Sequence, residues 1–128
     1  GAPTGANTNF RPEDKANFTL LLREFRTQLD ALSRTTHHRY SLTAFLPANP
    51  DNVTAGFEVA RIFRFLDWAT VQGYDLHGTW ESTTNYQSAL FAAKGDPTTP
   101  VKFDVDLAIR TLLKKDAPSD KLVMGLPF

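Results

Sequence analysis

Three short apolar segments alternate with longer segments of helical pattern, and this alternation constrains the fold more than any other feature of the chain. The apolar segments span residues 40–50, 68–73 and 121–128 of a 128-residue sequence. They are short and rich in β-forming residues, which is typical of strands buried on both faces of a sheet. Strands that alternate with helices of about ten residues or more predict right-handed βαβ units and a parallel sheet.

The first helix is the most strongly indicated element. It is expected to begin near Pro12, because proline is favoured in the first helical turn, and the acidic residues that follow suit the positive end of a helix. Its apolar positions have the spacing of a single helical face. They are Phe18, Leu21, Leu22, Phe25, Leu29 and Leu32.

Two further helices are predicted between the strands. One covers about residues 54–65, and the other covers 105–115, where Asp104 is placed to cap the N-terminus. The long segment 78–102 is expected to be a loop that allows one helical turn around 88–93.

A sheet of only three parallel strands would leave inward-facing residues such as Phe45 and Val71 without a packing partner. A closed (β/α)8 TIM barrel solves this problem, and it needs roughly 250 residues. The chain also begins without Met and ends on the apolar segment "KLVMGLPF", as expected of a piece cut from something longer. We therefore predict an α/β fold in which residues 1–128 form about half of one TIM-barrel domain. Residues 1–11 are expected to be a loop, and 12–128 the helix and strand units.

Composition narrows the range of functions. The 14 basic and 14 acidic residues balance, which argues against nucleic acid or an anionic membrane surface as the main partner. There is no cysteine, so disulfides and thiolate metal sites are excluded. No apolar run approaches the roughly 20 residues of a membrane span. His37 and His38 have no acidic pair nearby, so no metal site is expected there.

Polar and aromatic groups gather after the second predicted strand, in the stretch "DWATVQGYDLHGTWE". In parallel α/β folds, functional groups collect at the C-terminal ends of strands. Tyr74 offers a hydroxyl donor, Asp75 an acceptor, and Trp80 a flat apolar face with one N–H. A sugar ring presents the matching groups, which are hydroxyls and amides to hydrogen-bond and C–H groups that stack on indole. This pattern therefore favours a carbohydrate site.

These residues also resemble a known family. The stretch "VQGYDLHGTWE" is similar to the strand-six signature M-x-Y-D-[FL]-H-G-x-W of family 18 glycoside hydrolases, the chitinases. The segments "PEDKANFTLLLREFRTQLDA", "YSLTAFLPA" and "DAPSDKLVMGLPF" resemble that family's fourth helix, fifth strand and seventh strand. The family carries its catalytic acid in a D-x-x-D-x-D-x-E motif on strand four. No such motif occurs in these 128 residues; the nearest pattern, Asp104-Val105-Asp106, lacks the Glu.

The resemblance implies substrate-assisted hydrolysis of β-1,4 bonds in chitin, with the acid upstream of this chain. It implies that Tyr74 and Asp75 are catalytic: Tyr74 holds the substrate's acetamido oxygen, while Asp75 bonds the sugar and influences the acid. It implies that Trp80 is an aromatic platform and that Gln72, Phe45 and Leu126 bind substrate. Gln72 and Leu126 stand where the family often has Met. No cofactor or metal is implied. The expected partners are an N-acetylglucosamine oligosaccharide and the remainder of the same barrel, and the expected location is extracellular.

Two other functions and several plainer roles stay open. The protein could be a chitinase-like lectin in which the acid is replaced, or the segment could assemble with copies of itself. Tyr74 could be a boundary tyrosine, Asp75 a turn cap and Trp80 a packing residue at the barrel rim. His77 is expected to be a structural histidine, hydrogen-bonded within its loop.

Overall fold

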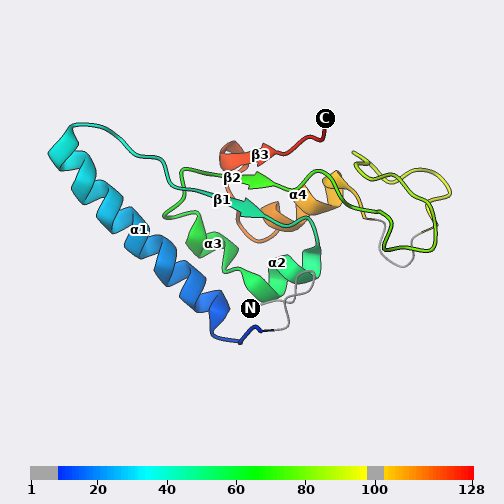
Figure 1. Ribbon diagram of the computed structural model, residues 1–128, viewed down its shortest axis with the longest axis horizontal. Helices are drawn as coiled ribbons and strands as arrows, with labels where there is room; N and C mark the ends of the chain where they lie inside the picture. Colours follow the sequence, from blue (N-terminus) through cyan, green and yellow to red (C-terminus); the bar gives the residue numbers. More distant parts are fainter. Residues whose placement is uncertain (1–8, 98–102) are drawn as a thin grey trace.

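The computed structural model describes residues 9–97 and 103–128. Residues 1–8 of the predicted loop 1–11 and residues 98–102 of the predicted loop 78–102 lie outside the described range. Helical segments separate the strands along the described part, as the sequence predicts, although two short helices stand between β1 and β2 (Figure 1). The elements are α1 (Asp14–Thr36), β1 (Thr43–Leu46), α2 (Pro50–Gly56), α3 (Val59–Ile62), β2 (Trp68–Val71), α4 (Val105–Leu113), the 3-10 turn η1 (Ser119–Lys121) and β3 (Leu122–Met124).

The three strands form one parallel sheet in the order β1-β2-β3. Ala69 of β2 pairs with Ala44 of β1 and with Leu122 of β3. Because all three strands run in the same direction, their C-terminal ends meet at one edge of the sheet. The predicted parallel sheet is confirmed, and the residues that follow β1, β2 and β3 are brought to the same side.

One face of the sheet is covered by helices and the other is open. Leu46, Ala69 and Val71 are completely buried and pack with helix residues such as Ile62 and Leu112. Successive side chains of a strand point to opposite faces, so the neighbours of these residues project away from the helices. The open face retains large apolar groups that are 39–52% exposed, namely Phe45, Trp68 and Val123.

This alternation corrects the prediction that Phe45 and Val71 face the same way. Phe45 pairs with Thr70, whereas Val71 pairs with Leu46. Val71 therefore lies on the helix-covered face with Leu46, where it is fully buried, and Phe45 lies on the open face.

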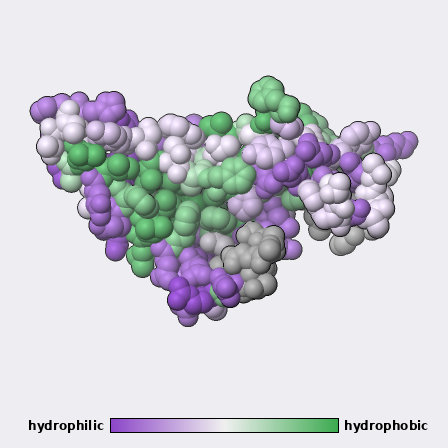
Figure 2. Space-filling model, viewed as in Figure 1, coloured by the Kyte–Doolittle hydropathy of each residue, from purple (hydrophilic) through white to green (hydrophobic). Residues whose placement is uncertain are grey.

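Helix α1 uses only part of its predicted apolar stripe for packing. Leu22 is buried, and the ring of Phe18 meets Phe57 edge-on at a centroid separation of 5.4 Å. Leu21 and Phe25 remain about half exposed, at 51% and 49%. Apolar surface is accordingly visible along α1 and toward the sheet (Figure 2).

The single helix predicted over 54–65 is wrong: the chain forms two short helices instead. Asn49 caps α2 by accepting hydrogen bonds from the backbone N–H groups of Asp51 (2.8 Å) and Asn52 (3.3 Å), so the helix begins earlier than predicted. Phe57 then adopts an extended conformation, with φ −133° and ψ 136°, which ends α2 and presents its ring to α1.

The remaining elements are close to the prediction, with shorter bounds. Asp104 caps α4 as predicted, and its Oδ1 accepts a hydrogen bond of 2.7 Å from Leu107 N–H. The third strand covers only Leu122–Met124, and residues 88–93 form no helical turn.

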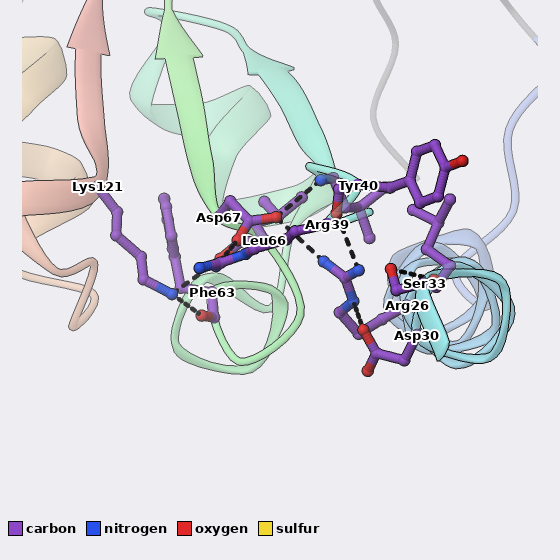
Figure 3. Close-up of polar contacts among 11 residues, drawn as sticks. Arg26, Asp30, Ser33, Arg39, Tyr40, Phe63, Leu66, Asp67 and Lys121 are labelled. Atoms are coloured by element: carbon purple, nitrogen blue, oxygen red, sulfur yellow. Dashed lines mark hydrogen bonds and ion pairs between the residues drawn. The ribbon is translucent and has the colours of Figure 1, made fainter. Parts of the chain in front are cut away.

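Asp67 links three segments below the N-terminal ends of the strands (Figure 3). It accepts hydrogen bonds from Arg26 of α1 (3.0 Å), Arg39 (2.7 Å) and the backbone N–H of Leu42 (2.8 Å). Partial burial by itself raises the pKa of the Asp67 carboxyl, but the Leu42 hydrogen bond and the two guanidinium groups outweigh it and lower that pKa below its ordinary value. These contacts join α1 to the start of β1 and β2.

Candidate functional site

The candidate site lies beyond the C-terminal ends of the strands (Figure 1). Asp67, which directly precedes β2, is at the opposite end of the sheet. Two hydrogen bonds continue the sheet past β2: Gln72 N–H donates to Leu46 O (3.0 Å), and Gly125 N–H donates to Val71 O (2.9 Å). The backbone that leads into the polar stretch is therefore held on both sides.

Tyr74 lies against the segment that follows β3. A Cβ added to Gly125 would be 3.1 Å from Cε1 of Tyr74, so the phenol ring rests close to the Gly125 backbone. The tyrosine is half-buried, and no hydrogen bond involves its hydroxyl group within residues 9–97 and 103–128. This hydroxyl is therefore free to donate to a ligand.

Asp75 occupies a tight turn directly after Tyr74. Its φ is 52°, in the left-handed region that Asp and Asn adopt more readily than most residues. The side chain is exposed, and its Oδ1 accepts a hydrogen bond of 3.0 Å from Nε2 of Gln87. The next residue, Leu76, returns to the core and is 3% exposed.

A pocket of about 530 Å³ adjoins this turn. Asp75, Trp80 and Gln87 contribute to its lining. The indole of Trp80 is 65% exposed and lies over the backbone of Gly78, where an added Cβ would come within 2.4 Å of the ring. The pocket thus combines a carboxylate, an amide and an exposed aromatic face.

The loop around the pocket is organised by His77, which is 3% exposed. Its Nδ1 lies 2.9 Å from a carboxylate oxygen of Glu81, so Nδ1 carries the hydrogen. Asn85 lies on the other side of the ring and donates to Asp96 (2.9 Å), and the ring meets Phe103 edge-on. The prediction of a structural histidine, hydrogen-bonded within its loop, is confirmed.

The sequence-predicted residues fall into two groups. Asp75 and Trp80 line the pocket, and Tyr74 precedes them in the chain. Gln72 is half-buried at the end of β2, and Phe45 and Leu126 are 52% and 56% exposed; none of these three lines the pocket. Phe45 lies on the open face of the sheet, whereas Gln72 and Leu126 follow the C-terminal ends of β2 and β3.

The sequence does not indicate that Gln87 belongs to the site. It lies 12 residues after Asp75, in a loop without periodic spacing, so no local pattern indicates the contact between them. Where the structure describes the chain, no group of three or more His, Cys, Asp or Glu residues could hold a metal ion. No helix in the same ranges is long and apolar enough to cross a membrane.

Comparison with known proteins identifies the family. The model of glycosyl hydrolases family 18 matches residues 3–128. The chain belongs to this family. Probable chitinase 2 of Drosophila melanogaster is 38% identical over 118 residues, which cover 92% of this chain and 22% of that protein.

Solved structures of family 18 agree with the fold. Chitinase ChiA74 from Bacillus thuringiensis matches with a TM-score of 0.93 at 38% identity, over 100% of this chain and 20% of that one. The second catalytic domain of Ostrinia furnacalis Group II chitinase, solved in complex with penta-N-acetylchitooctaose, matches with a TM-score of 0.81 at 27% identity, over 94% of this chain and 29% of that one. The three parallel strands and their helices are therefore part of a (β/α) barrel. This chain spans about a fifth of the first two of these proteins.

Proposed function

We propose that this chain is the segment of a chitinase barrel that orients the substrate's acetamido group for hydrolysis of β-1,4 bonds in chitin. The observation that carries the proposal is that Tyr74 and Asp75 leave the C-terminal end of β2 together, next to a pocket with an exposed tryptophan. Family membership and the Ostrinia furnacalis complex with a chitin oligosaccharide support this substrate class.

The reaction uses the substrate's own acetamido oxygen as the nucleophile. A glutamic acid outside these 128 residues protonates the glycosidic oxygen. As the bond to the leaving sugar breaks, the acetamido carbonyl oxygen forms a bond to C1 and a cyclic oxazolinium ion results. Water then attacks C1 and gives up a proton to the same glutamate. The bond between C1 and the acetamido oxygen breaks, which restores the acetamido group and leaves C1 with retained configuration.

Tyr74 supplies orientation in this scheme. Its hydroxyl, which has no hydrogen-bond partner in the described part of the chain, donates to the acetamido oxygen and holds it in line with C1. A fixed donor of this kind lowers the barrier through positioning and through stabilisation of developing charge.

Asp75 and Trp80 supply charge and a stacking surface. Only one Asp75 oxygen bonds Gln87, so the other remains available to a sugar hydroxyl or amide, and the carboxylate influences the proton affinity of the nearby acid. Trp80 presents its exposed indole to the C–H face of a sugar. Phe45 contributes a further contact on the open face of the sheet, and Gln72 and Leu126 contribute contacts beyond the ends of β2 and β3.

The rest of the same barrel is the partner that covers the apolar surface left open here. Phe45, Trp68 and Val123 on the sheet, with Leu21 and Phe25 on α1, are the groups it would bury. Residues 1–128 then act as one part of a larger barrel domain. The whole protein acts outside the cell, where chitin is found; cell fractionation tests this location.

The experiment compares Tyr74→Phe and Asp75→Asn with the unchanged full-length protein on chitin oligosaccharides. Tyr74→Phe removes a donor aimed at developing charge and is expected to lower kcat by about 100-fold. Tyr40→Phe, which removes a hydroxyl at the far end of β1, is the matched control and is expected to retain full activity. Unchanged turnover in Tyr74→Phe contradicts the proposed role.

A lectin is the second candidate, because Tyr74, Asp75 and the exposed Trp80 could bind a sugar without taking part in any chemistry. The same experiment separates the two functions. Binding of chitin oligosaccharide that weakens in Trp80→Ala, without release of shorter sugars by the unchanged protein, selects the lectin.

A further inference from the structure

We propose that Gln87 is a positioning residue that fixes the carboxylate of Asp75 for the substrate. This inference rests on the proposed function of Asp75 and extends the site to a residue that no sequence pattern indicates. The loop segment at Gln87 and Ser88 lies along the turn that carries Tyr74 and Asp75, and it fastens that turn by three hydrogen bonds.

The three hydrogen bonds surround Asp75 along the chain. Before it, the Ser88 hydroxyl donates to the carbonyl oxygen of Gly73. After it, the Leu76 N–H donates to the carbonyl oxygen of Gln87 at 2.9 Å. Between them, Nε2 of Gln87 donates to Oδ1 of Asp75 at 3.0 Å. Backbone and side chain of Asp75 are therefore held by one neighbouring segment.

Asp75 needs such support because its surroundings give it little. Its backbone has a φ of 52°, a conformation that L residues adopt at a cost, and its side chain is exposed. An exposed carboxylate without a fixed donor rotates among several rotamers. The Gln87 amide selects one orientation and leaves Oδ2 without a hydrogen bond to any described residue, so that this oxygen is available to a ligand.

Gln87 is itself held by a regular element. The two residues after Ser88 accept hydrogen bonds from the first turn of α4: Val105 N–H donates to Ala89 O (3.0 Å), and Asp106 N–H donates to Leu90 O (3.1 Å). Gln87 also lines the same pocket as Asp75. Helix α4 therefore holds residues 89–90, and the adjoining Gln87 in turn holds the Asp75 carboxylate.

The test compares Gln87→Leu with Gln28→Leu in the full-length protein, with a fluorogenic N-acetylglucosamine oligosaccharide as substrate. Gln28 makes a similar amide-to-carboxylate hydrogen bond to Glu24 (2.9 Å) on the exposed side of α1, so it is a matched control. Loss of a hydrogen bond to a charged group is expected to lower kcat about tenfold in Gln87→Leu, with KM changed far less. Gln28→Leu is expected to keep the kcat of the unchanged protein.

A second variant, Gln87→Glu, gives a readout that a purely structural role would not move. At neutral pH it places two carboxylates in contact, which displaces Asp75. At low pH the protonated Glu side chain donates in place of the amide. The activity of Gln87→Glu relative to the unchanged protein is therefore expected to recover as pH falls from 7 toward 5.

Crystal structures of Gln87→Leu and Gln28→Leu complete the test without depending on catalysis. The inference predicts that the Asp75 carboxylate turns from its place only in Gln87→Leu. An unchanged Asp75 together with unchanged kcat overturns it. If the unchanged protein neither cleaves nor binds chitin oligosaccharides while Asp75 still turns in Gln87→Leu, the proposed function fails and the positioning contact stands.

Discussion

Replacing Asp67 by Asn tests the contact network that joins α1 to the strands. The Asp67 side chain is 13% exposed, and its carboxylate meets Arg26, which is 18% exposed, and Arg39, which is 84% exposed. The Arg39 pair contributes little, because solvent screens an exposed ion pair. Asn retains an oxygen for Leu42 N–H but loses the charge facing Arg26, so we expect a loss of about 1.5–3 kcal/mol in the free energy of unfolding. Asp67→Ala also leaves Leu42 N–H unpaired and is expected to lose about 1–3 kcal/mol more.

The pH dependence of this loss follows from the lowered pKa of Asp67. A carboxyl with a lower pKa in the folded state stabilises the fold above its unfolded pKa of about 4, and this contribution disappears as pH falls through the folded value. The difference between the unchanged protein and Asp67→Asn should therefore be constant above about pH 5 and shrink below about pH 4. Urea denaturation of the full-length protein at pH 7 and pH 3.5 measures it.

Asp106→Asn is the control for this prediction. Asp106 pairs with Arg110 on the surface of α4 at 2.8 Å, with side-chain exposures of 33% and 67%. Its loss is expected to be below about 1 kcal/mol. If Asp67→Asn destabilises no more than Asp106→Asn at pH 7, or if its effect does not diminish in acid, the network around Asp67 does not stabilise the fold as argued.

Two further predictions concern the candidate site and the helix that supports it. Gly78→Ala places a Cβ 2.4 Å from the Trp80 ring, so the indole must move. We expect isothermal titration to show weaker binding of chitin oligosaccharides, while the free energy of unfolding changes by less than about 1 kcal/mol. Unchanged binding would contradict the stacking role of Trp80. Asp104→Ala removes the cap of α4 and is expected to lower the free energy of unfolding by about 1–2 kcal/mol, measured by urea denaturation. Asp104→Ser can still accept from Leu107 N–H and should lower it far less. Equal losses in the two variants would show that the cap is not the cause.

The sequence predicts those parts of the fold that depend on neighbouring residues. The spacing of Phe18 and Leu22 indicates α1, and Asp104 before an apolar pattern indicates the start of α4. Both predictions hold because capping and helical periodicity act within a few residues. The parallel order of the strands follows from their alternation with helices in the same way.

The features that the sequence does not predict depend on contacts between distant segments. The break at Phe57 between α2 and α3 accompanies a ring contact with Phe18, 39 positions earlier in the chain. The side to which Val71 points depends on where β2 begins, because a shift of one residue reverses every side chain of a strand. The contact of Gln87 with Asp75 depends on a loop returning to the strand end. The roles assigned to Tyr74 and Trp80 remain predictions.

Strand β2 connects a region that supports stability with a region that supports function. Asp67 precedes its first residue and Asp75 lies four residues beyond its last; at about 3.3 Å per residue the four steps from Asp67 to Val71 alone span about 13 Å, so the two carboxylates lie more than about 10 Å apart. Effects of substitutions more than about 10 Å apart usually add, because such residues share no partners. Asp67 is bound by Arg26, Arg39 and Leu42, whereas Asp75 is bound by Gln87, and the two sets have no residue in common. A protein weakened at Asp67 should therefore keep the geometry at Asp75 as long as it remains folded. Conversely, the loop at Gln87 can change without affecting the contacts that join α1 to the sheet.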